Sequence, residues 1–127
     1  MKLAQALKDC APVYLISPYT KYWRGHCGAY IDISKLGAKI FLKHRIVTFS
    51  PIGHGHGMAA HGDMPKVSPK LWKEFNQPFV DLFDAALVAK LDGWDVSAGS
   101  NDEIGDFRDA KKMIAFVHPE TLELTLD

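Results

Sequence analysis

The sequence predicts an α/β protein: a single domain with a doubly wound, mostly parallel sheet of about five strands and flanking helices, in a Rossmann-like or flavodoxin-like arrangement. Two observations predict this fold class. Short apolar runs recur along the chain, and segments with helical spacing of apolar residues separate them. The chain has 127 residues, enough for one hydrophobic core and too few for two, so residues 1–127 are expected to form one domain.

Five segments are expected to form strands. The first is an apolar run at residues 12–17, ended by a proline, which is typical of a buried parallel strand. Similar runs follow at residues 46–49, 85–91 and 113–117. Residues 122–126 alternate apolar and polar side chains, which predicts a half-buried strand at a sheet edge.

Three segments have the periodicity of helices. A crossover helix is expected from Ala29 to residues 43–45, whose basic side chains suit the negative pole of a helix dipole. Residues 71–83 carry a second apolar stripe that Pro78 interrupts, so two short helices or a kink are expected there. Residues 100–112 are expected to form a third helix, followed by the fourth strand.

Composition excludes several functional classes. Lys plus Arg and Asp plus Glu both total 15, so the net charge is zero and no basic stretch predicts binding to a nucleic-acid polymer. No membrane-spanning run, dinucleotide-binding glycine motif, phosphate-loop lysine motif or Gly-x-Ser-x-Gly elbow is present. The two cysteines lack metal-ligand spacing and are expected to be free thiols in the cytoplasm.

The loops beyond the carboxyl ends of the strands are the expected binding site, because ligands bind there in sheets of this kind. Three loops fall at that edge, at residues 17–28, 51–69 and 92–100. Residues 53–69 are rich in Gly, His and Pro and are expected to form a long, mobile polar lid.

Glu103 is the most informative candidate. It follows the turn that contains Ser97, Gly99 and Ser100, where backbone N–H groups can hold an anion or a sugar hydroxyl. In the first helical turn its ionisation would be favoured by the helix dipole, as attack on an anomeric carbon requires. The alternative is structural: Ser100-x-x-Glu103 is also a capping box, in which each side chain bonds the other residue's amide.

Histidines in the Gly-rich segment have two interpretations. His54 and His56 can chelate a metal together with His61 or Asp63, but flexible glycines hold ligands poorly. A lid over the pocket, with one histidine reaching the substrate, is therefore favoured, and no metal or cofactor is expected.

Other side chains near these loops are weaker candidates. Asp81 and Asp84 can bind a base or a sugar, although each is as readily a solvent-facing helix carboxylate. Arg24 can meet a phosphate. Aromatic rings that can stack on a planar base, or equally pack in the core, are Tyr14, Tyr19, Tyr22, Trp23 and Trp94.

Three segments together resemble the nucleoside 2-deoxyribosyltransferase superfamily. VYLISP at residues 13–18 is similar to its first strand, and FSPIGH at residues 49–54 is similar to the end of its second strand. Residues 84–103 are similar to its third strand, glycine turn and nucleophile helix. The resemblance spans nearly the whole chain and is strongest to an uncharacterised family of small proteins usually grouped beside the transferases.

The resemblance implies that Glu103 is the nucleophile and that Tyr14 orients its carboxylate. Six positions before the nucleophile, the transferases tend to carry aspartate and the nucleotide hydrolases a serine that contacts the 5′-phosphate. This chain has Ser97 there, which favours a nucleoside 5′-monophosphate as substrate and water as acceptor. A hydroxyl can donate to phosphate, whereas a carboxylate would repel it.

The superfamily's second site aspartate has no aligned counterpart, since a gapless match puts Phe75 or Asn76 near that position. Asp81 is therefore a catalytic candidate by role, together with Glu103 and Tyr14. The remaining alternatives are a base-exchanging deoxyribosyltransferase and an inactive nucleotide-binding module. A homodimer or larger oligomer is also implied. The expected substrate-binding residues are Ser17, Pro18, Tyr19, Arg24, His54, Asp84, Trp94, Ser97, Gly99 and Ser100.

Overall fold

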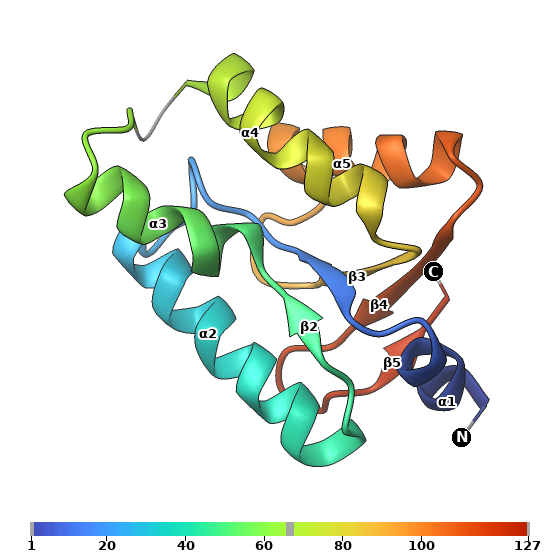
Figure 1. Ribbon diagram of the computed structural model, residues 1–127. Coiled ribbons are helices and arrows are strands. Elements are labelled where there is room, and N and C mark those ends of the chain that lie inside the picture. The colour runs from blue at the N-terminus through green and yellow to red at the C-terminus, as the bar shows by residue number, and fades with distance from the viewer. Residues whose placement is uncertain (1, 66–67, 127) are drawn as a thin grey trace.

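A computed structural model describes residues 2–65 and 68–126 and confirms the predicted α/β fold class. Five strands form one sheet in the order β2-β1-β3-β4-β5, and the first four run parallel (Figure 1). They are β1 (Val13–Ile16), β2 (Thr48–Phe49), β3 (Ala85–Ala89), β4 (Met113–Val117) and the antiparallel edge strand β5 (Leu124–Thr125). All five predicted strands are present, and β1, β2, β3 and β5 are shorter than predicted.

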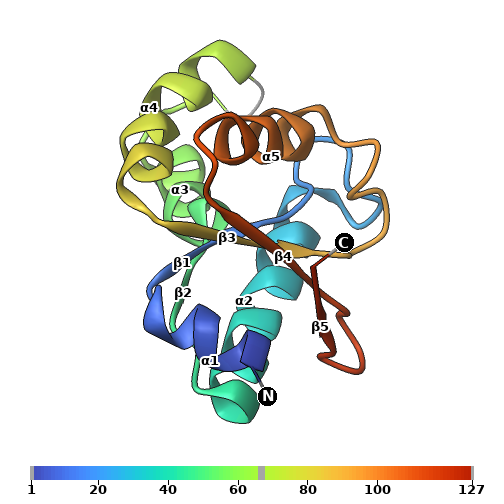
Figure 2. The same cartoon turned by 90° about the vertical axis from the view of Figure 1, so that its right-hand side faces the viewer.

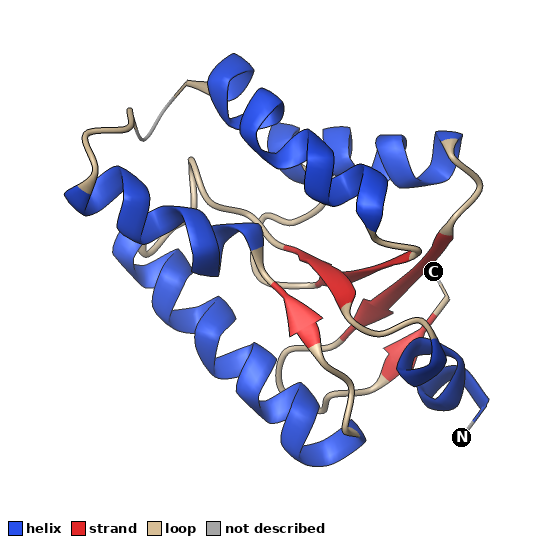
Figure 3. Ribbon diagram, in the orientation of Figure 1, coloured by secondary structure: helices blue, strands red, loops and turns tan. Residues whose placement is uncertain are grey.

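Helices cover both faces of the sheet (Figures 2 and 3). Successive residues of β1 point to opposite faces, as the period of a strand requires. Leu15 packs in a core with residues of α1 (Lys2–Asp9) and α2 (Gly25–His44). Tyr14 and Ile16 pack in a second core with residues of α4 (Pro69–Leu82) and α5 (Ala98–Asp109). The result is a three-layer domain with an apolar sheet at its centre.

The strand order places a topological switch point between β1 and β3. The connection from β1 leads outward to β2 on one side, and the chain then returns to pair β3 on the other side of β1. Loops that leave the two strands at such a point diverge and open a crevice. This edge of the sheet is therefore where a site is expected.

The prediction of a loop at residues 53–69 is largely wrong, because helix α3 (Pro51–His61) occupies most of this segment. The Ser50 side chain caps this helix by accepting a hydrogen bond from the Gly53 amide at 2.9 Å, and Pro51 takes the first helical position. α3 lies beside α2 (Figure 1). Residues 66 and 67 of the predicted loop lie outside the described residues.

Four other helices differ from the prediction, and the first of these, α2, begins at Gly25 and not at Ala29. α4 is one helix with Pro78 inside it, not two short helices, and it begins with Pro69 in the first turn. α5 begins two residues before Ser100 and ends at Asp109. α1 was not predicted. No helix in the described part of the chain is long and apolar enough to cross a membrane.

Candidate active site

A cavity of about 450 Å³ lies at the carboxyl ends of β1 and β3. Its walls come from the loop after β1, from α3 and α4, from the loop after β3 and from the first two turns of α5. The volume falls in the range of small-molecule sites, roughly 300–1,000 Å³. The three segments predicted to surround a ligand therefore do meet, although one of them is a helix.

Glu103 lines this cavity, and the buried side chain of Tyr14 holds its carboxylate in place. Tyr14 is completely buried on β1, where its ring packs against Phe49, Phe83 and Phe107 with centroids 6.1, 5.8 and 5.5 Å away. Its hydroxyl donates a short hydrogen bond to Oε2 of Glu103. The phenol thus joins a rigid strand to a carboxylate on α5 and fixes where that carboxylate lies.

Burial sets the protonation of this pair. It raises the pKa of Glu103 from its ordinary value of 4.5 to about 7; the hydrogen bond from Tyr14 opposes the rise, and the charges of Asp106 and Asp102 add to it. Burial, followed by the charge of Glu103, raises the pKa of Tyr14 well above its usual range, so the phenol stays a donor. From the sequence, the helix dipole was expected to favour ionisation of Glu103. It does not outweigh the effect of burial on the pKa, because Glu103 lies in the second turn of α5 and not in the first.

The capping-box interpretation of Glu103 is wrong. Ser97 is the N-cap of α5, and its Oγ accepts a hydrogen bond from the Ser100 amide at 3.3 Å. Ser100 is therefore the third residue of the helix, and Glu103 is the sixth. The Glu103 carboxylate bonds Tyr14 instead of an amide of its own helix end.

Three buried polar atoms in the cavity wall have no hydrogen-bond partner among the described residues. They are Oγ of Ser17, Oδ1 of Asn76 and Oγ of Ser100. They come from the end of β1, from α4 and from the first turn of α5. An unpaired buried polar atom costs on the order of 1–3 kcal/mol, so their gathering around one cavity points to a polar ligand.

The structure brings most of the predicted site residues together. Tyr14 is hydrogen-bonded to Glu103. The predicted residues that line the cavity are Ser17, Pro18, Tyr19, Ser97, Gly99, Ser100 and Glu103. They arrive from β1, the loop after it, and the start of α5. Residues as much as 86 positions apart therefore share one wall.

Five predicted residues lie elsewhere. Asp81 is exposed on α4 and accepts a hydrogen bond from Gln77, and Asp84 is exposed at the opposite, amino end of β3. His54 stacks on Phe75, outside the cavity wall, with ring centroids 5.8 Å apart.

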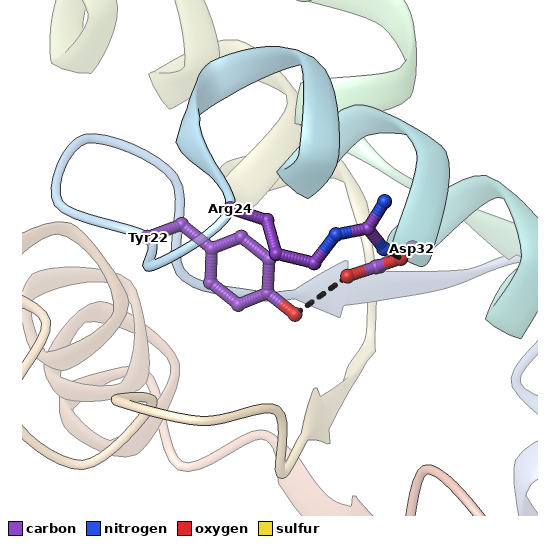
Figure 4. A network of polar contacts seen from close by, with 3 residues as sticks. All are labelled: Tyr22, Arg24 and Asp32. Carbon is purple, nitrogen blue, oxygen red and sulfur yellow. Dashed lines mark hydrogen bonds and ion pairs between the residues drawn. The ribbon is translucent and has the colours of Figure 1, made fainter.

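Arg24 and Trp94 also lie away from the cavity. Arg24 directly precedes α2 and forms an ion pair with Asp32, which also accepts a hydrogen bond from the Tyr22 hydroxyl at 2.8 Å (Figure 4). Trp94 packs against Phe116 with ring centroids 5.4 Å apart. Among the described residues, no group of three or more His, Cys, Asp or Glu side chains is arranged to hold a metal ion.

Residues 11–118 match the model of a family described as a domain of unknown function, DUF1937. The chain belongs to the DUF1937 family. Comparison with curated proteins gives no significant match.

Several residues that line the cavity of this DUF1937 domain were not predicted from the sequence, among them Trp72 and Asn76 on α4. His56 on α3 also lines the cavity; from the sequence it was considered as a metal ligand with His54, or as one of the lid histidines of which one reaches the substrate. Trp72 and Asn76 are four positions apart and so lie on one helix face, which was treated as an apolar stripe for core packing. The gapless match near Asn76 was the available signal.

Proposed function

We propose that this protein cleaves the N-glycosidic bond of a nucleoside 5′-monophosphate, with Glu103 as nucleophile. The observation that carries the proposal is the Tyr14–Glu103 pair in the wall of a cavity at the switch point. Attack on an anomeric carbon needs an ionised carboxylate in a fixed position. A pKa of about 7 leaves a large ionised fraction at neutral pH, and the resemblance to the deoxyribosyltransferase superfamily supports the same role.

In the proposed reaction the Glu103 carboxylate attacks the anomeric carbon while the carbon–nitrogen bond breaks and the base leaves. Water then hydrolyses the glycosyl-enzyme, and the anomeric configuration is retained. Tyr14 holds Oε2 and orients the carboxylate. Asp81 and Asp84 lie outside the cavity wall, so the leaving base takes its proton from solvent water in the proposal.

The phosphate is proposed to bind at the start of α5. Ser97, Gly99 and Ser100 line the cavity there, and a helix N-terminus favours an anion. The hydroxyls of Ser17 and Ser100, which have no partner among the described residues, supply donors from two different elements. The start of α5 and the end of β1 therefore match the needs of a monophosphate.

The base is proposed to lie against α4. Trp72 offers a flat ring for stacking, and Asn76 offers an amide whose Oδ1 is unpaired. The Trp72 ring is itself held, because its Nε1 donates to the Pro65 carbonyl at 2.6 Å. A planar heterocycle with a polar edge fits this pair of side chains.

The test is to incubate the full chain with ribo- and deoxyribonucleosides and their 5′-monophosphates, with and without an acceptor base, and to measure free base by chromatography. Release from a monophosphate that Glu103→Gln abolishes supports the proposal. The matched control is Glu120→Gln, an exposed glutamate outside the cavity wall, which should leave the rate unchanged. Release only with an acceptor would make the protein a transferase. Thermal stabilisation without release would contradict turnover and indicate a binding module.

A further inference from the structure

A thiol, an imidazole and a phenol meet at the edge of the cavity, apart from the Tyr14–Glu103 pair. The Cys27 sulfur lies 3.9 Å from Nε2 of His56, and Nδ1 of the same ring lies 2.8 Å from the Tyr19 hydroxyl oxygen. The three residues come from α2, α3 and the loop after β1. They are 29 and 37 positions apart, so the fold and not a local motif assembles them.

The imidazole is held in place by its neighbours. The His56 ring stacks on Tyr30, with centroids 4.7 Å apart and planes 17° from parallel, and it meets Tyr19 edge-on at 5.9 Å. Tyr19 in turn stacks on His26 at 4.4 Å. These contacts fix the direction of both ring nitrogens, one toward the phenol and the other toward the thiol.

Cys27 is also placed for reactivity. It is exposed, unlike the half-buried Cys10, and it lies in the first turn of the 20-residue helix α2. Thiols in the first helical turn and beside a histidine are typical reactive cysteines. A nucleophile, a base in reach of it and a third group that orients the base form the arrangement of an activated nucleophile.

Two of the three residues also line the cavity, which has polar ligand-binding features of its own, whereas Cys27 lies outside the cavity wall and is exposed. Tyr19 and His56 line the cavity, and Ser17, two residues before Tyr19, contributes a hydroxyl to the same wall. That hydroxyl is unpaired among the described residues, and Ser17 is only 6 % exposed. A small polar molecule bound in the cavity would therefore lie beside the imidazole.

We propose that Cys27 is a modification site for small polar carbon electrophiles, with His56 accepting the proton of the thiol. In the step, the sulfur–hydrogen bond breaks and the proton passes to Nε2 of His56. The sulfur forms a bond to carbon, and the leaving group departs with its electron pair; with iodoacetamide that group is iodide. The inference is independent of the proposed glycosidase function, because its readout is alkylation and not base release.

The experiment follows alkylation of the full chain by iodoacetamide, with Cys27 and Cys10 quantified separately by mass spectrometry. Cys27 should react faster than Cys10. His56→Gln should slow Cys27 by at least about tenfold, which is less than the roughly hundredfold to ten-thousandfold that a positioned base typically contributes, and leave Cys10 unchanged. The matched control is His61→Gln, which removes an exposed imidazole at the end of the same helix α3 and should leave the Cys27 rate within about twofold of wild type.

A Cys27 rate in His56→Gln within twofold of wild type would overturn the proposal, because exposure alone would then explain the reactivity. If His56→Gln does not fold, Tyr19→Phe replaces it, since this change keeps the ring and removes only the hydroxyl that faces Nδ1. The proposal then requires a slower reaction at Cys27 with Cys10 unaffected. An unchanged Cys27 rate in Tyr19→Phe would equally refute it.

Discussion

Replacement of Glu103 by glutamine should stabilise the protein at alkaline pH while abolishing the proposed activity. Glutamine has the size of glutamate and keeps an oxygen to accept the hydrogen bond from Tyr14. It lacks the negative charge, whose burial is the main reason that the Glu103 pKa is raised. The exchange therefore removes a cost of folding and preserves packing.

The sign and size follow from proton linkage. The folded protein binds the Glu103 proton more tightly than the unfolded chain, with a pKa of about 7 against an ordinary 4.5. The contribution of Glu103 to wild-type stability is therefore highest below pH 4.5, falls as the pH rises from 4.5 to 7, and levels off above 7. The difference is about 2.5 pH units, and at roughly 1.4 kcal/mol for each unit it corresponds to about 3 kcal/mol.

The assay is urea unfolding of wild type and Glu103→Gln at a series of pH values, with the free energy of unfolding obtained by linear extrapolation. Other titrating groups are common to both proteins and cancel in the difference. The variant's advantage should grow from near zero at about pH 4 to about 3 kcal/mol at about pH 8. Glu120→Gln should show no such growth. A difference between wild type and Glu103→Gln that is independent of pH would refute the reasoning.

Two other predictions concern Tyr14 and Gly55. Turnover should rise with pH through about 7 as Glu103 ionises. Tyr14→Phe removes a hydrogen bond that lowers the pKa of Glu103, so it should move this rise to higher pH in a pH–rate profile. An unmoved profile would contradict the role of the phenol. Gly55→Ala should lower the free energy of unfolding by about 1–3 kcal/mol, because its Cβ would lie 2.9 Å from the Trp72 ring. At Gly57 on the same helix an added Cβ would meet open space, so Gly57→Ala should raise the free energy of unfolding by about 0.5–1 kcal/mol in the same denaturation assay. Equal effects at both glycines would argue against the contact with Trp72.

The sheet could be predicted from sequence because its strands are buried on both faces. β1, β3 and much of β4 consist of apolar residues that are inaccessible or nearly so, which appear in the sequence as uninterrupted apolar runs. β5 was recognised by alternation, and it is indeed the antiparallel edge strand. The carboxyl edge, and with it the general position of the cavity, followed from the order of these elements.

α3 was missed because its buried face lacks large apolar side chains. The residues that it buries are Pro51, Gly55 and Ala59, spaced by four positions as in a helix. Such small residues let α3 pack closely, and a Cβ at Gly55 would lie only 2.9 Å from the Trp72 ring. A search for large hydrophobic residues does not detect this periodicity. The Ser50–Pro51 pair was the local signal, being an N-cap followed by a proline in the first turn.

The interpretation of Glu103 was undecided in the sequence for a different reason. Ser97 and Ser100 can each cap a helix, and a capping box for Glu103 requires that Ser100 does so. In the folded protein Ser97 caps α5, which leaves the Ser100 hydroxyl unpaired in the cavity wall and places Glu103 one turn deeper. There the carboxylate meets Tyr14, 89 positions earlier in the chain. Tyr14 belongs to a strand across the switch point, so a local sequence pattern could not reveal this contact. The same contact places Glu103 in the cavity wall rather than at the helix end.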